Sequence, residues 1–200
     1  MIQRFIYTVD QLNKTVGHAF AWCIMILTFG TCYEVFVRYV LNAPTSWAFD
    51  MSYMLYGAVF YMAGAYTLSR GGHVRADMFY RLWSERTQAV VELTLYVLFF
   101  FPGILALVVA GWGYGIESVR LREVSVNSPA GVPIWPLKMM ISVGAGLMVL
   151  QGFAEVLRCV LCLREGRWAG RLHDVEELEK QILAQHAQEV APQTAPGAAR

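Results

Sequence analysis

Long stretches without charged side chains dominate the chain. Four such runs contain no Asp, Glu, Lys or Arg: residues 15–33, 51–69, 93–116 and 139–154. A helix needs about 20 residues to cross the ~30 Å hydrocarbon core of a bilayer, and soluble helices need a polar face that these runs lack. The pattern therefore predicts an all-α membrane protein with four transmembrane helices, over about 15–41, 47–69, 88–117 and 135–163.

The third predicted span is too long to cross a membrane upright. Pro102 lies inside it, and a proline within a helix removes one backbone hydrogen bond and clashes with the preceding turn. We therefore expect this helix to be tilted or kinked.

Composition supports one membrane domain. Apolar residues make up 56% of the chain and charged residues 16%, against about 25% charged in soluble domains. A net charge of +1 and only four cysteines give no sign of a nucleic-acid-binding surface or of a disulfide-stapled fold. We predict a membrane domain over 1–168 and a cytoplasmic tail over 169–200, with a short helix followed by a disordered end.

Lysine and arginine are distributed unevenly between the two sides of the predicted spans. Twelve of the sixteen flank the N-terminus, the second connection or the C-terminus. Because basic residues concentrate on the cytoplasmic side, the pattern predicts that both termini are cytoplasmic.

Two segments outside the spans have the spacing of amphipathic helices. Residues 1–14 repeat apolar side chains at helical intervals, and residues 74–86 do the same with arginines opposite. Such helices lie in the membrane interface with the apolar face toward lipid. We expect one interfacial helix before the first span and another between the second and third.

Ionisable residues near the spans allow several interpretations. Glu34 and Arg38 have the i,i+4 spacing of an intrahelical pair, but they could also contact another helix or subunit, or form a proton-coupling site. Asp50 is either a helix-start acid favoured by the helix dipole or a partner contact. Glu155 and Arg158 are expected to form a pair at a span boundary.

Cofactor and catalytic chemistry are not expected. His18 is the only histidine within a predicted span, whereas a haem between helices needs two facing axial ligands. Cys159 and Cys162 form a CxxC on an apolar helix end with no second cysteine pair, and a metal site needs further ligands. Ser, His and Asp do not converge in the pattern, so no enzyme is predicted.

The motifs at the span ends occur in a familiar order. The first span ends in Arg-Tyr-Val-Leu-Asn (38–42), the second opens with Trp-Ala-Phe-Asp (47–50), Gly-Gly-His-Val-Arg-Ala-Asp (71–77) follows it, and Pro-Ile-Trp-Pro (133–136) opens the fourth. This order resembles the small permease subunit, or DctQ-like subunit, of tripartite ATP-independent periplasmic (TRAP) transporters. The family commonly has an acidic pair after the tryptophan, where this chain has Asp50 alone.

The resemblance implies a division of labour. In such systems a large permease subunit moves the substrate with a sodium gradient, a periplasmic solute-binding protein delivers it, often an organic acid, and the small subunit is a scaffold in the bacterial inner membrane. It implies no cofactor and no nucleic acid. Candidate subunit-interface or topology residues are Glu34, Arg38, Trp47, Asp50, His73, Arg75 and Asp77, with contact to membrane lipids as the alternative for His73 and Arg75.

Two other functions are compatible with four short spans. One is a self-sufficient small exporter with Glu34 as its proton-coupled acid, and the other is a membrane anchor for a redox enzyme. Secondary transporters often carry repeated halves with broken helices, and no two halves of this chain match. Transport by the chain alone, or a haem spectrum, would distinguish these functions.

Overall fold

The computed structural model describes residues 2–71, 83–166, 168 and 183. The chain divides into two units, Met1–Ala169 and Gly170–Arg200, and the description below concerns the first. His73, Arg75 and Asp77, most of the predicted helix over 74–86, and the predicted helix of the tail lie outside the described residues.

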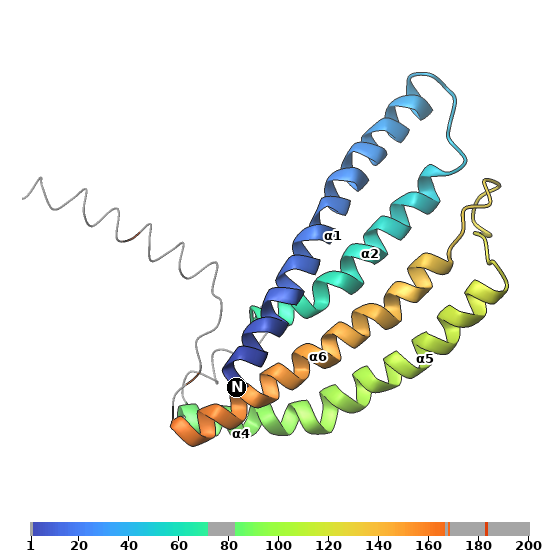
Figure 1. Ribbon diagram of the computed structural model, residues 1–200. Coiled ribbons are helices and arrows are strands. Elements are labelled where there is room, and N and C mark those ends of the chain that lie inside the picture. Colours follow the sequence, from blue (N-terminus) through green and yellow to red (C-terminus); the bar gives the residue numbers. More distant parts are fainter. Residues whose placement is uncertain (1, 72–82, 167, 169–182, 184–200) are drawn as a thin grey trace, which may run out of the picture. The chain divides into compact units, whose positions relative to one another are not determined.

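Most of the described residues of the first unit are helical (Figure 1). The elements are α1 (Ile2–Tyr39), α2 (Ala48–Ser69), α4 (Glu85–Leu95), the π-helical turn η1 (Tyr96–Phe100), α5 (Phe101–Arg120) and α6 (Trp135–Glu165). An isolated antiparallel bridge between Val124 and Pro133 closes the connection between α5 and α6.

Three helices are long and apolar enough to cross a membrane: Ile2–Tyr39, the continuous helix Glu85–Arg120, and Trp135–Glu165. The helix α2 lies within two residues of the second predicted span at both ends, but it is not among these three. Its 22 residues include four tyrosines, which lower its apolar character. The prediction of an all-helical membrane protein is confirmed, whereas the count of four spans stays a prediction.

The first helix differs from its prediction. Residues 2–14 are helical as expected, but they continue into the first span without a break, so a separate helix ending at residue 14 is wrong. No proline interrupts this region, and the polar side chains of Asp10 and Asn13 are buried in α1. Their burial is possible because both side chains find partners on α6.

The helix Glu85–Arg120, the third predicted span, contains a π-helical turn just before Pro102. The backbone N–H of Phe101 donates to the carbonyl of Tyr96, five residues earlier, at the end of the π-helical turn. Single π turns are common causes of helix kinks, as are prolines. Phe100 in this turn packs against Gly152 of α6, where an added Cβ would lie 2.5 Å from the ring.

The long helices pack in the order α1, α2, α6 and α5 (Figure 1). The helix α4 also packs against α6, and the N-terminal part of α1 reaches α6 directly. Glycines mark the closest approaches, because a Cβ on Gly144 would lie 2.5 Å from the carbonyl oxygen of Tyr61, and Gly111 and Gly115 of α5 face α6. Small residues thus allow the close backbone contact that is typical of membrane helices.

Most of the apolar surface of these helices faces outward. Only 6% of the most apolar stretch of α1 is buried inside the chain, and 11% of that of Glu85–Arg120. Trp22, Phe99 and Val109 are among the large apolar side chains that are at least 70% exposed. A water-soluble monomer rarely exposes such surface, so lipid or protein must cover it.

Candidate functional site

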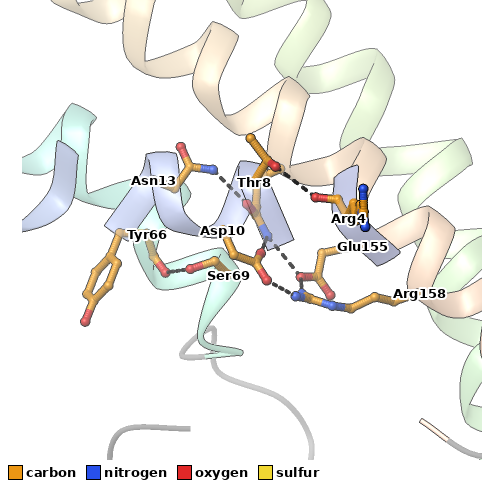
Figure 2. A network of polar contacts seen from close by, with 9 residues as sticks. Arg4, Thr8, Asp10, Asn13, Tyr66, Ser69, Glu155 and Arg158 are labelled. Atoms are coloured by element: carbon orange, nitrogen blue, oxygen red, sulfur yellow. Dashed lines mark hydrogen bonds and ion pairs between the residues drawn. The ribbon is translucent and has the colours of Figure 1, made fainter. Parts of the chain in front are cut away.

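Five buried polar side chains join the N-terminal part of α1 to the C-terminal half of α6 (Figure 2). We call them the α1–α6 polar cluster: Asp10, Asn13, Gln151, Glu155 and Arg158. None of them is more than 4% exposed. Charged groups are buried at such cost that they need partners, and the cluster supplies those partners from two helices.

Arg158 connects the two helices through separate nitrogens. Its Nη1 donates to Glu155 on the same helix, and its Nη2 donates to the carboxylate of Asp10 on α1. Asp10 and Glu155 are formally negative and Arg158 is positive. One guanidinium group is therefore shared by two carboxylates from different helices.

Gln151 completes the cluster as both a hydrogen-bond acceptor and a donor. Its Oε1 accepts from Nδ2 of Asn13 at 2.7 Å, while its Nε2 donates to Asp10 at 3.0 Å and to Glu155 at 3.2 Å. Buried hydrogen bonds of this kind polarise one another and fix side-chain positions. The cluster therefore sets both the rotation and the height of α1 on α6.

Apolar packing encloses the same contact. Ile6 and Val9 of α1 pack with Ala154 of α6, which is fully buried. The small alanine lets α1 approach closely. These side chains are buried, and the low local dielectric of a buried contact strengthens the ion pairs of the cluster.

Asp10 and Asn13 were missed at the sequence level. The Glu155–Arg158 pair forms as predicted, but its link to Asp10 was not foreseen. A signal existed, because Ile6, Asp10, Asn13 and Gly17 recur at intervals of three and four residues, and all four are buried. One helix face that mixes apolar and polar residues in this way is a sign of contact with a polar partner helix.

Asp50 lies in the first turn of α2 and is completely buried. Its carboxylate accepts hydrogen bonds from the hydroxyl of Ser125 at 2.6 Å and from that of Ser128. Ser125 in turn accepts from the backbone N–H of Asn127 at 3.1 Å. Asp50 thus fastens the connection between α5 and α6 to the start of α2.

Glu34 and Arg38 form the predicted intrahelical pair, with Nη2 of Arg38 2.6 Å from Oε1 of Glu34. Thr45 adds hydrogen bonds from its backbone N–H, at 3.3 Å, and from its hydroxyl. The Glu34 side chain is 12% exposed and that of Arg38 48%. The carboxylate is therefore covered by the connection between α1 and α2, whereas the guanidinium remains accessible.

Trp47 immediately precedes α2 and stacks on Tyr33 of α1, with ring centroids 6.5 Å apart. It is 42% exposed. Both rings line an apolar groove of about 620 Å³ between α1 and α2. Of the predicted candidates, Trp47 and Arg38 are thus the most accessible of those that the structure describes.

The cysteine pair of α6 faces α4. The thiol of Cys159 lies 3.8 Å from a carboxylate oxygen of Glu92, and that of Cys162 lies 3.7 Å from the backbone carbonyl of Glu85. Within the described residues, no group of three His, Cys, Asp or Glu side chains is placed to hold a metal ion.

Residues 27–162 match a model of the family described as tripartite ATP-independent periplasmic transporters, DctQ component. The chain belongs to this family. The resemblance found at the span ends is thereby confirmed, and the chain is a small membrane subunit of a TRAP transporter. No match was found among curated proteins. The matched part of this DctQ component includes Gln151, Glu155 and Arg158, whereas Asp10 and Asn13 lie before it.

Proposed function

We propose that this DctQ component is a scaffold for the large permease subunit in the bacterial inner membrane. The assembled transporter would take up an organic acid that a periplasmic binding protein delivers, driven by a sodium gradient. The chain would cross the membrane four times, with α2 as the second span and with both termini in the cytoplasm.

The observation that carries the proposal is the placement of apolar and polar side chains. Large apolar side chains face outward along α1 and along Glu85–Arg120. The buried charges of the α1–α6 polar cluster and of Asp50 are bound within the chain. Apolar outer surface suits lipid and a partner subunit, and polar groups engaged in helix contacts suit a rigid body.

The candidate interface residues differ in how exposed their side chains are. Trp47 and Arg38 are exposed enough to touch a partner directly. Asp50 is completely buried, so it would act on a partner through the connection that it holds. The assembly roles proposed for His73, Arg75 and Asp77 rest on the family resemblance alone.

Reconstitution tests the scaffold role. Vesicles containing the large subunit, with or without this chain, would receive the binding protein, a labelled organic acid and an inward sodium gradient. We expect uptake only when both membrane subunits are present. Uptake by the large subunit alone would contradict the scaffold role, and transport by this chain alone would favour the exporter with Glu34 as its acid.

Cysteine accessibility tests the four-span topology. Pro44→Cys lies in the connection before α2, and Ser84→Cys lies before α4. If α2 crosses the membrane, an impermeant maleimide added to intact cells labels residue 44 and not residue 84. Labelling of both or of neither would show that α2 does not span.

Trp47 offers a test of the interface. Trp47→Ala should lower copurification of the large subunit, because aromatic side chains dominate contact energies. Trp47→Phe retains a ring and serves as the conservative control. Equal copurification of Trp47→Ala and the parent chain would remove Trp47 from the interface.

A further inference from the structure

The α1–α6 polar cluster contains a contact between the first and last of the long helices. Asp10 and Arg158 are 148 residues apart in the chain, and they are joined by an ion pair in which neither side chain is more than 5% exposed. We propose that Asp10 and Arg158 form a lock that makes the placement of α1 and the placement of α6 depend on each other. The lock goes beyond the scaffold role and holds whatever partner the chain has.

The hydrogen-bond donors of Arg158 are only partly used within α6. Glu155 engages one nitrogen of Arg158, while the Nη2 group is directed to Asp10. Ionisable groups within membrane helices are costly unless they are paired. Because α1 supplies the second carboxylate, the Nη2 group of Arg158 keeps its acceptor only when α1 is in place.

The dependence also operates in the other direction. Both oxygens of the Asp10 carboxylate accept hydrogen bonds from α6, one from Gln151 and one from Arg158. Asn13 donates to Gln151 as well. Without α6, the polar face of α1 that carries Asp10 and Asn13 would lose these partners, and Ile6 and Val9 would lose their packing against Ala154.

One partner of the lock, Asp10, lies in a part of α1 that the family match does not cover. The match begins at residue 27, so Asp10 is contributed by the chain's own N-terminal turns. Its test therefore needs a reporter near residue 10. Val9 is suitable, because it is 3% exposed and packs in the same contact.

The experiment uses the full chain carrying Val9→Cys, labelled with N-ethylmaleimide in detergent, with modification read at residue 9 by mass spectrometry. We expect slow labelling of residue 9 in the chain that carries Val9→Cys alone. Adding Asp10→Ala should make this labelling about tenfold faster, because α1 then opens locally from α6. Arg158→Leu should accelerate labelling further, since it removes the positive charge between the carboxylates of Asp10 and Glu155, which then repel each other. Glu34→Ala breaks an ion pair confined to α1 and the adjoining connection, and it should leave labelling unchanged.

Charge exchange separates the lock from general damage to the fold. Asp10→Arg combined with Arg158→Asp keeps one positive and two negative groups in the cluster. The exchange variant should be protected more strongly than either single variant, and it should accumulate better in membranes if the single variants fail to fold. Parent-like protection of Asp10→Ala, an exchange variant no better than the single variants, or equal acceleration by Glu34→Ala would each overturn the proposal.

Discussion

The hydroxyl of Ser125 donates a 2.6 Å hydrogen bond to the carboxylate of Asp50, which lies 75 residues earlier in the chain. Asp50 is completely buried and Ser125 is 6% exposed. The Ser128 hydroxyl binds the second carboxylate oxygen. An acid at the start of one helix therefore orders the connection between two other helices.

We expect Asp50→Ala to loosen the connection over residues 121–134. The substitution leaves two hydroxyl groups without their acceptor, and loss of hydrogen bonds to a buried charge costs about 3 kcal/mol. Limited proteolysis of the purified chain should show earlier cleavage within this connection. Glu117→Ala removes an exposed carboxylate from the end of α5 and provides the control, which should be cleaved like the parent. If Asp50→Ala is cleaved as slowly as the parent, the assigned role of Asp50 is refuted.

The helix ends were largely predictable because charge-free runs are local. Both ends of α2 fall within two residues of the predicted span, and α6 begins at the predicted Trp135. The separate interfacial helix predicted before the first span is wrong for a non-local reason. Residues 2–14 do have amphipathic spacing, but the buried face of this segment packs against α6.

The contacts between distant residues could not be predicted from the pattern. Glu155 and Arg158 are one turn apart, so their pairing follows from helix geometry. The third member, Asp10, depends on how α1 crosses α6, and no local spacing specifies that crossing. The same holds for Gly111 and Gly115, whose GxxxG spacing indicates close packing but not that α6 is the neighbour.

Gly144 should tolerate a methyl group poorly. A Cβ there would lie 2.5 Å from the backbone carbonyl oxygen of Tyr61, so α2 and α6 would have to separate. Overpacking of this kind costs about 1–3 kcal/mol, although alanine favours a helix over glycine by about 1 kcal/mol. We expect Gly144→Ala to lower the thermal midpoint of the purified chain.

Gly146 provides the matched control for Gly144. It lies two residues further along the same helix, and an added Cβ would meet nothing within 4 Å. Gly146→Ala should leave the midpoint unchanged or raise it, since only the helix-propensity gain remains. If both substitutions shift the midpoint alike, the close approach of α2 and α6 at Gly144 does not determine stability.

The ion pair between Glu123 and Lys138 should make the connection between α5 and α6 sensitive to acid. Nζ of Lys138 lies 2.5 Å from the carboxylate of Glu123 and donates a hydrogen bond to it. This hydrogen bond holds the pKa of Glu123 below its ordinary value of 4.5. A carboxyl group whose pKa is lowered on folding stabilises the fold above its unfolded pKa, and this contribution is lost as the pH falls through the folded value. We therefore expect protection to be constant above about pH 4.5 and to decline below it.

Hydrogen exchange of two backbone amides measures this decline. Ser125 N–H donates to Val132 and Ile134 N–H donates to Glu123, so both report on the closed connection. After correction for the intrinsic pH dependence of exchange, protection should fall a few-fold in acid, a small change because the pair is partly exposed. Glu123→Gln cannot titrate and should lack this component of the decline. An identical pH profile for Glu123→Gln and the parent would show that another group is responsible.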